Sequence, residues 1–344
     1  MKRAVLIGEK LMEVQEAARP AIKANEVLVE NEVCGICGSD LHIYGGNHPV
    51  LKPPVSMGHE FAGRVVEVGA DVRSIRIGDY VCAIPGVGCG KCEPCQAGKF
   101  NLCRELKVIG GLYPGGFAEY TAVPEYNIVK IPELFSATDG AMVESAAVAV
   151  HAVSRMKSVE GKKIAVLGAG PIGLLIIQVL KAFGAKLVVA SDPIESRRDI
   201  ASRLGADIVI DPTKENVEER IQAEVGGIGL DGAFDVAGIE LTLGQALAVT
   251  KNGGEIVITA LFSKDPVFPM KMLQRAEKTL LGTQMYVKQD FETAIQLMQE
   301  NKIKIDEMVT HRFDLDQISE AFKLATSGAH HVGKMVIDVK KQAL

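Results

Sequence analysis

Three glycines at the junction of an apolar strand and an apolar helix constrain this chain more than any other feature. Gly168, Gly170 and Gly173 form the pattern G-x-G-x-x-G between the apolar runs 164–168 and 171–184. In this context the first glycine allows a tight turn, the second lets the backbone approach a pyrophosphate, and the third permits close helix–strand packing. The N–H groups and partial positive charge of the helix N-terminus favour an anion there. The turn therefore predicts a dinucleotide-binding site.

An acidic residue follows the next predicted strand, 187–191. Asp192 can accept hydrogen bonds from the adenosine ribose hydroxyls, and its charge would repel a 2′-phosphate, so NAD is expected over NADP. Arg197 and Arg198 keep NADP open, because an arginine can serve a 2′-phosphate. The alternative interpretation is a glycine turn needed only for helix packing, followed by a surface aspartate.

Strands and helices alternate along the chain from about residue 164 onward. The predicted strands are 164–168, 187–191, 207–211, 232–238, 254–261 and 279–284, with helical stretches such as 171–184 and 195–205 between them. Short apolar strands that alternate with helices predict a parallel, doubly wound sheet that is buried on both faces. The tail adds two amphipathic helical stretches and a strand at 291–300, 317–328 and 334–339. Spacing does not decide which domain this tail joins.

The region before residue 140 has a different character. Short apolar stretches separated by Gly and Pro predict a barrel or sandwich of short strands, at 26–35, 61–69, 79–84, 117–123 and 127–131. A helical stretch, 137–156, leads from this region into the glycine turn. A chain of 344 residues is too long for one ordinary core, so two domains are expected.

All seven cysteines lie before residue 104, and four of them form one cluster. Cys89, Cys92, Cys95 and Cys103 have the spacing C-x2-C-x2-C-x7-C, which lets neighbouring sulfurs converge on one ion. Four thiolates make a closed tetrahedral zinc site, which is structural because no position remains for a substrate. A redox switch and a zinc-ribbon contact to nucleic acid remain the alternatives, although the net charge of −5 disfavours the second.

A second set of candidate zinc ligands is spread along the chain. Cys37 lies in C-G-I-C-G-S-D-L-H, and His59 and Glu60 lie in M-G-H-E-F-A-G. One thiolate, one imidazole and one carboxylate suit a zinc ion with an open position, which would lower the pKa of a bound alcohol. Ser39 and His42 have the side chains that a proton relay needs. By spacing alone, each of these residues is unremarkable.

Bulk properties exclude several classes of protein. The acidic balance argues against binding to duplex nucleic acid, and no apolar run of about 18 residues predicts a membrane span. The N-terminal sequence lacks the length and cleavage site of a signal peptide, so an intracellular, cytoplasmic protein with reduced cysteines is expected.

Taken together and in this order, the motifs resemble the zinc-containing medium-chain dehydrogenase/reductase family over nearly the whole chain. G-I-C-G-S-D-L-H is similar to the family's catalytic-zinc loop, G-H-E-F-A-G to its second ligand loop, the four-cysteine segment to its structural-zinc lobe, and G-A-G-P-I-G to its coenzyme turn. The resemblance implies a GroES-like β-barrel catalytic domain (1–145, completed by 286–344) and a Rossmann domain (146–285) that binds NAD. It also implies two zinc ions per chain, a small-molecule alcohol substrate, and a homotetramer or dimer.

The resemblance assigns roles to particular residues. The implied ligands of the catalytic zinc are Cys37, His59 and Glu60, with Glu144 as a fourth, exchangeable ligand, and Ser39 is implied to carry the first proton transfer, with His42 in the relay. The implied coenzyme contacts are Gly168, Gly170, Pro171, Ile172, Gly173, Asp192, Arg197, Thr259, Ala260, Leu261, Gly282, Thr283 and Gln284.

Within the family, the chain is most similar to sorbitol, butanediol, threonine and sugar-acid dehydrogenases, because Glu60 follows His59 and Glu144 replaces a cysteine ligand. Ser145 stands where sorbitol dehydrogenases have proline, and Met285 stands where they have a substrate-binding arginine. These departures argue against sorbitol itself. The predicted reaction is oxidation of a secondary alcohol of polyol or sugar type to a ketone. The alternatives are a threonine 3-dehydrogenase, a gulonate-type sugar-acid dehydrogenase, and a non-enzymatic coenzyme-binding protein.

Overall fold

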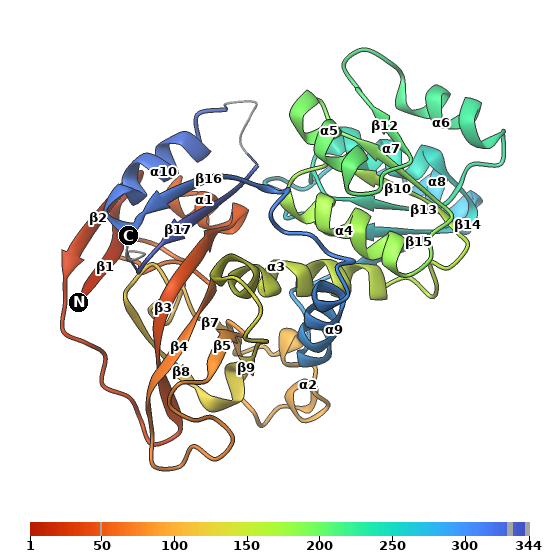
Figure 1. Cartoon of the computed structure of the whole chain (residues 1–344). Helices are drawn as coiled ribbons and strands as arrows, with labels where there is room; N and C mark the ends of the chain where they lie inside the picture. Colours follow the sequence, from red (N-terminus) through yellow and green to blue (C-terminus); the bar gives the residue numbers. More distant parts are fainter. Residues whose placement is uncertain (49, 329–332, 341–344) are drawn as a thin grey trace. The chain divides into compact units, whose positions relative to one another are not determined.

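The computed structural model describes residues 1–48, 50–328 and 333–340, and its chain divides into two compact units (Figure 1). The first unit comprises Met1–Ser145, Val287–Phe291 and Val309–Leu344. The second unit comprises Ala146–Tyr286 and Glu292–Met308. The tail is therefore divided, because 292–308 belongs to the second unit and 309 onward to the first.

The second unit contains a six-stranded sheet in which every pairing is parallel. Its strands are β10 (Lys163–Leu167), β11 (Leu187–Ser191), β12 (Ile208–Ile210), β13 (Leu230–Asp235), β14 (Thr250–Ile258) and β15 (Thr279–Gly282). Its helices include α4 (Pro171–Ala182), α5 (Glu195–Arg203), α6 (Val217–Val225), α7 (Glu240–Val249), α8 (Met270–Arg275) and most of α9 (Lys288–Gln299). The doubly wound parallel sheet predicted from the sequence is confirmed.

The strand order of this sheet is β12-β11-β10-β13-β14-β15. The order therefore reverses between β10 and β13, and in such sheets ligands bind outside the carboxyl ends of the strands at this point. Ile164 to Leu167 of β10 are fully buried, as expected for a strand covered on both faces. The sheet thus directs the glycine turn after β10 to the ligand-binding edge.

Three predicted strands of this sheet end earlier than the sequence suggested. The predicted strands 232–238, 254–261 and 279–284 end at Asp235, Ile258 and Gly282. Asp235 Oδ1 accepts hydrogen bonds from the backbone N–H groups of Ala237 and Gly238, both at 3.2 Å, which turns the chain out of β13. The residues that follow these strands therefore lie in loops at the carboxyl edge.

The first unit is built around a seven-stranded, mainly antiparallel sheet. Its strands are β3 (Glu26–Ile36), β4 (Glu60–Val68), β5 (Tyr80–Ala83), β8 (Tyr120–Pro124), β9 (Ile128–Lys130), β16 (Val309–Asp314) and β17 (Lys334–Asp338). Separate pairs are formed by β1 (Lys2–Gly8) with β2 (Leu11–Glu16), and by β6 (Gly86–Val87) with β7 (Lys107–Val108). The β-rich region predicted before residue 140 is confirmed.

Strand β3 organises the first unit because it pairs with three other strands. It pairs with β4 along most of its length, with β8 in its first half and with β17 in its second half. Nearly every β3 side chain is buried, and the adjoining core contains Phe61, Phe117 and Phe322. The carboxyl end of β3, the start of β4 and the start of β17 are thus brought together from distant parts of the sequence.

The short helices of this unit are α1 (Gly38–Tyr44), α2 (Glu93–Gln96) and α10 (Ile318–Ala325), with 3-10 turns η1 (Phe100–Leu102), η2 (Glu125–Asn127) and η3 (Leu315–Gln317). The 18-residue helix α3 (Ala137–Ser154) begins in the first unit and ends in the second. Cys34 and Cys82 belong to neither set of candidate zinc ligands, and both are buried. Among the described residues, no helix combines the length and the apolar character needed to cross a membrane.

Candidate metal centres and coenzyme site

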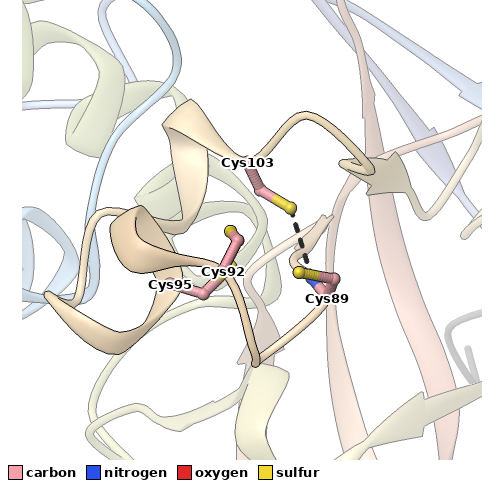
Figure 2. Close-up of side chains that lie close together, drawn as sticks. All are labelled: Cys89, Cys92, Cys95 and Cys103. Atoms are coloured by element: carbon pink, nitrogen blue, oxygen red, sulfur yellow. Dashed lines mark hydrogen bonds between the residues drawn. The ribbon is translucent and has the colours of Figure 1, made fainter.

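The four clustered cysteines lie together in one lobe of the first unit (Figure 2). Their sulfur atoms all lie within 4.8 Å of one another, and α2 begins directly after Cys92. The backbone N–H of Cys89 donates to Cys103 Sγ at 3.3 Å, and strands β6 and β7 close the base of the lobe. A side chain at Gly88 would lie 2.8 Å from Cys95 Sγ, so the lobe needs glycine there.

Two of these thiols differ strongly in acidity. Backbone N–H groups of Lys91 and Cys92 lower the pKa of Cys89 to about 6. The N–H of Cys95 lowers the pKa of Cys92, but burial and the neighbouring cysteines outweigh it and raise this pKa to about 12. Four thiolates at this separation repel one another unless a cation lies between them, and the donor set is that of a structural zinc ion.

The second candidate centre also assembles in the first unit. Ligand atoms of Cys37, His59 and Glu60 lie within 4.8 Å of one another. Cys37 follows β3 and immediately precedes α1, whereas His59 and Glu60 lie at the start of β4. Strands β3 and β4 are paired with Gly35 opposite Glu60, so the antiparallel register carries the two segments to one place. The three side chains suit a zinc ion with an open coordination position.

Asp40 contacts two of these three residues, although it was not among the residues predicted from the sequence. Its side chain is fully buried; Oδ2 accepts a hydrogen bond from the backbone N–H of Cys37 at 3.0 Å, and Oδ1 lies 3.5 Å from His59 Nδ1. Burial lowers the pKa of His59, but Asp40 and Cys37 outweigh burial and raise it well above its usual value. With Nδ1 facing a carboxylate, Nε2 is the ring nitrogen that could bind a metal.

Glu60 has a buried partner on each carboxylate oxygen. Ser145 Oγ, from α3, donates to Oε1 at 2.6 Å, and Lys334 Nζ, from β17, donates to Oε2. Burial raises the pKa of Glu60, but Lys334, His59 and Ser145 together lower it below its usual value. Burial also lowers the pKa of Lys334, while Glu60 and Cys37 raise it more. Lys334 was missed in the sequence, because a single lysine at the start of the last strand carries no motif.

The remaining predicted catalytic residues lie around this group. Ser39 and His42 lie on α1, which begins after Cys37, and both side chains are partly exposed. Glu144 is buried on α3 next to Ser145 and is close enough to Lys334 to raise its pKa. Glu144 is not among the three residues whose ligand atoms converge within 4.8 Å. Its role as an exchangeable fourth ligand therefore stays a prediction.

In the second unit, the glycine turn has the geometry of an anion site. Gly168 has a φ of +106°, and Gly170 precedes Pro171, the first residue of α4. A side chain at Gly173 would lie 2.0 Å from the carbonyl oxygen of Gly168, whereas one at Gly170 would meet nothing within 4 Å. Close packing at Gly173 and open space at Gly170 are what a phosphate group at this helix N-terminus requires.

The acidic residue after β11 is already held by backbone groups. Asp192 Oδ2 accepts a hydrogen bond from Ala169 N–H at 2.8 Å, and Oδ1 accepts one from Ile194 N–H at 2.9 Å. Arg197 Nη1 lies 3.8 Å from Asp192 Oδ2, whereas Arg198 donates to the Asp192 carbonyl oxygen and pairs with Asp211 at 2.9 Å. Arg198 therefore stabilises this turn, and Asp192 is linked directly to the glycine turn.

The predicted contacts after β14 and β15 lie side by side at the carboxyl edge of the sheet. Ile258 pairs with Gly282, and Thr283 N–H donates to the Ile258 carbonyl oxygen at 3.2 Å. The hydroxyls of Thr259 and Thr283 are buried and lack a hydrogen-bond partner within the described residues. Buried hydroxyls are normally hydrogen-bonded, so this pair fits a site that a polar ligand completes. Leu261 is exposed, and Ala260 and Gln284 adjoin the same edge.

Comparison with known proteins identifies the family. Residues 23–133 match the alcohol dehydrogenase GroES-like domain, and residues 171–300 match the zinc-binding dehydrogenase domain. The chain belongs to the zinc-containing medium-chain dehydrogenase/reductase family. The predicted GroES-like and Rossmann folds and the predicted zinc and nicotinamide coenzyme are confirmed at this level, and the chain is a dehydrogenase.

Several curated members of this dehydrogenase family are similar over most of their length. The L-threonine 3-dehydrogenase of Pyrococcus furiosus is 36% identical, over 99% of this chain and 98% of its own. The sorbitol dehydrogenase of Bombyx mori is 34% identical over 95% of both chains, and the L-galactonate-5-dehydrogenase of Escherichia coli K12 is 33% identical over 87% of both. These dehydrogenases act on different alcohols, so identity at this level establishes the alcohol dehydrogenase class and no single substrate.

Solved structures of the family share the same fold. The 2R,3R-butanediol dehydrogenase from Bacillus subtilis is 34% identical with a TM-score of 0.91, covering 98% of this chain and 99% of its own. A zinc-binding dehydrogenase from Sinorhizobium meliloti 1021, bound to NADP, is 33% identical with a TM-score of 0.92 and the same coverage. Family membership therefore supports a nicotinamide coenzyme and leaves the choice between its two forms to the residues around Asp192.

Proposed function

We propose that this chain oxidises a secondary alcohol group on a polyol or sugar-type substrate to a ketone, with transfer of hydride to NAD. The observation that carries the proposal is the convergence of Cys37, His59 and Glu60 beside two buried partners, Asp40 and Lys334. Three protein ligands leave a zinc ion one position for a substrate, in contrast to the closed set of four cysteines. Glu144 belongs to this proposal as the exchangeable fourth ligand.

The proposed chemistry divides between the cofactors and the side chains. Zinc supplies a Lewis acid that lowers the pKa of the substrate hydroxyl, and NAD supplies the hydride acceptor. Ser39 Oγ accepts the hydroxyl proton as it gives its own proton to His42, one turn later on α1, and His42 then releases a proton to water. Asp40 holds the Cys37 backbone and the His59 ring in place during this transfer.

NAD over NADP is the part of the proposal that depends on Asp192. Its carboxylate lies beside the glycine turn, where it would attract ribose hydroxyls and repel a 2′-phosphate. Asp192→Ala is expected to lower the ratio of kcat/KM for NAD to that for NADP by about tenfold, as for one lost discriminating interaction of ~1.4 kcal/mol. An unchanged ratio would remove Asp192 from coenzyme selection.

A second candidate function is oxidation of an amino-acid or sugar-acid alcohol, as in a threonine 3-dehydrogenase or a gulonate-type dehydrogenase. The observation that favours it is the 36% identity with a threonine dehydrogenase over nearly the whole chain. A carboxylate substrate needs a cationic partner, and Lys334 is already paired with Glu60. A polyol is therefore the preferred substrate class, ahead of an amino acid or a sugar acid.

A steady-state substrate panel tests both candidates. Purified, zinc-replete protein is assayed for NADH formation with polyols, simple secondary alcohols, sugar acids and L-threonine, each with NAD and with NADP. A kcat/KM at least about tenfold higher for a polyol than for the carboxylate substrates supports the proposal, which corresponds to 1.4 kcal/mol of discrimination. A preference for threonine or a sugar acid replaces the substrate class, and no turnover on any secondary alcohol overturns the function.

We also propose two coarser properties. The first is a division into a catalytic domain (1–145 with 286–344) and a coenzyme domain (146–285), in a cytoplasmic protein with reduced cysteines.

The second proposed property is assembly into a homotetramer or dimer. Strand β15 pairs on one side only within the described residues, and Leu280, Met270, Met272 and Val267 around it are exposed. An exposed apolar edge strand favours pairing with a second copy. Leu280→Lys, analysed by light scattering, should reduce the oligomer; an unchanged mass would move the interface elsewhere.

A further inference from the structure

The carboxylate of Glu60 is held at both oxygens by side chains from distant parts of the chain. Ser145 Oγ donates to Oε1 at 2.6 Å, and Lys334 Nζ donates to Oε2. Glu60, Ser145 and Lys334 are each at most 2% exposed. These bonds are therefore made away from water, where a carboxylate and its donors depend on one another for hydrogen bonds.

The surrounding backbone leaves the Glu60 side chain little freedom. Gly35 is the register partner of Glu60 in the β3–β4 pair. A side chain at Gly35 would lie 2.2 Å from Glu60 Oε2 and 3.1 Å from Lys334 Cε, so the ion pair occupies the space that a glycine leaves. The terminal torsion of a glutamate is normally broad. Donors on both oxygens and the packing at Gly35 restrict it here to one orientation.

Of the two donors, Ser145 is the one whose side chain is explained only by its hydrogen bond to Glu60 within the described residues. Its helix, α3, is apolar around it, with Ala146 and Ala147 fully buried, so an alanine at position 145 would suit the packing equally well. A buried hydroxyl costs free energy unless it is hydrogen-bonded. The partner that satisfies it is the carboxylate that faces Cys37 and His59.

We infer that Ser145 is a positioning residue of the catalytic metal centre, which with Lys334 fixes the orientation in which Glu60 contributes to metal binding. This inference rests on the proposed function, because it requires a zinc ion at Cys37, His59 and Glu60. Outer partners of a metal ligand set its orientation, and their loss typically weakens metal binding by about 10- to 100-fold. Ser145 acts through Glu60, the side chain to which its hydroxyl donates.

Ser145→Ala tests the inference, because it removes one hydrogen bond and leaves the Glu60–Lys334 pair intact. Replacing Lys334 would instead leave a buried carboxylate without its cation, which endangers folding itself. The measurement is release of zinc from the holoenzyme to a chromogenic chelator, resolved into the four-cysteine lobe and the catalytic centre. In Ser145→Ala the catalytic zinc should bind about tenfold more weakly, with the lobe unchanged. The visible spectrum of cobalt exchanged into the catalytic centre should shift as well.

A matched control separates positioning from general destabilisation. Thr138→Val removes another buried hydroxyl of α3, which accepts a hydrogen bond from Arg312 at 2.5 Å, and should leave catalytic zinc release unchanged.

Each outcome decides the matter. Unchanged zinc affinity and an unchanged cobalt spectrum in Ser145→Ala overturn the inference and leave the proposed function standing. An equal loss of catalytic zinc affinity in Thr138→Val also overturns it, because the effect would then follow from the loss of any buried hydroxyl of α3. A wild-type protein that carries zinc only in the four-cysteine lobe overturns the proposed function.

Discussion

The two candidate metal centres of the first unit are built in opposite ways. The four cysteines of the lobe lie within residues 89–103 and are mostly part-exposed, and their hydrogen-bond partners are backbone groups and cysteine side chains of the same segment. The Cys37 centre draws on β3, α1, β4, α3 and β17, and its supporting residues Asp40, Ser145 and Lys334 are buried. The four-cysteine centre is formed by one short, part-exposed segment, whereas the Cys37 centre is assembled by strand pairing.

This difference separates two uses of a metal. A lobe with little core of its own depends on the ion for its shape, because metal binding there is also folding free energy. The Cys37 centre already has its shape in strand pairing, a buried ion pair and a buried aspartate, so its metal can be given an open position without loss of the fold. The predictions below test whether catalysis and stability divide between the two centres in this way.

The largest expected effect is on turnover, from Cys37→Ser. A neutral hydroxyl is a poor replacement for a zinc-binding thiolate, so the centre loses Lewis-acid stabilisation worth several kcal/mol. At 1.36 kcal/mol per tenfold, this corresponds to a fall in kcat of about a thousandfold. NADH formation measures the loss, metal analysis should fall from about two zinc ions per chain to about one, and an unchanged circular dichroism spectrum shows that the fold persists.

The matched control is Cys82→Ala, which removes a buried cysteine of β5 outside both centres. It should keep both zinc ions and most of its turnover, with only the small cost in stability of a minor cavity. If Cys37→Ser kept its activity, the catalytic role of Cys37 would be wrong and the comparison between the centres would collapse.

The next largest effect is expected on zinc affinity, from Asp40→Asn. The amide preserves shape but removes the negative charge that faces His59 Nδ1. Loss of such an outer partner should weaken zinc binding at the Cys37 centre by about 10- to 100-fold and leave the lobe unaffected. Competition with a chelator measures both sites. Asp139→Asn is the control, because Asp139 also accepts hydrogen bonds in the first turn of a helix, but from Ser136 and not from a candidate zinc ligand among the described residues. Equal losses in the two variants would contradict the assigned role of Asp40.

The contrast between the centres also explains what could be predicted from sequence. The lobe could be predicted because its four cysteines are close in the chain and have a characteristic spacing. The turn at Gly168, Gly170 and Gly173 could be predicted for the same reason. At the other centre, Cys37, His59 and Glu60 are unremarkable by spacing. They were predicted as zinc ligands only because their motifs follow the order found in the dehydrogenase family. Lys334 could not be found, because it is 274 residues from Glu60 and only the pairing of β17 with β3 brings them together.

The fold follows the same rule. Alternating apolar runs and helices were sufficient to predict the parallel sheet, because each strand is buried on both faces. Strand ends were less predictable at Asp235, where a side-chain hydrogen bond turns the chain and apolarity continues beyond it. The destination of the tail depended on long-range pairing of β17 with β3, which local periodicity does not encode.

A smaller effect, of a few-fold, is expected in the reactivity of the metal-free lobe. Backbone N–H groups lower the pKa of Cys89 to about 6, so its thiolate form predominates above that pH. Alkylation of Cys89 should therefore rise as the pH increases through about 6 and level off near 7, whereas an ordinary thiol continues to rise through about 8.5. Peptide mapping after timed alkylation of zinc-stripped protein measures this profile.

Cys82 provides the internal reference for this profile. Burial raises the pKa of its thiol far above the usual range, so it should stay unlabelled until the fold is lost. A midpoint for Cys89 near that of an ordinary thiol would mean that its backbone donors do not hold the thiolate, and the lobe would then be shaped by zinc alone.

The smallest effect on turnover is expected from Cys103→Ser, although it removes a zinc ligand just as Cys37→Ser does. The lobe should lose its zinc and become open to protease within residues 89–103. That segment contains only the four-residue helix α2 and the 3-10 turn η1, and the short strands β6 and β7 flank it on either side. The Cys37 centre draws none of its ligands or buried partners from this segment, so kcat at low temperature should change by no more than about twofold, less than 0.5 kcal/mol. Steady-state turnover measures kcat, and limited proteolysis of the same sample measures whether the lobe has opened. A thousandfold loss here, equal to that of Cys37→Ser, would show that the lobe supports the catalytic centre directly and that the two metals do not divide stability from catalysis.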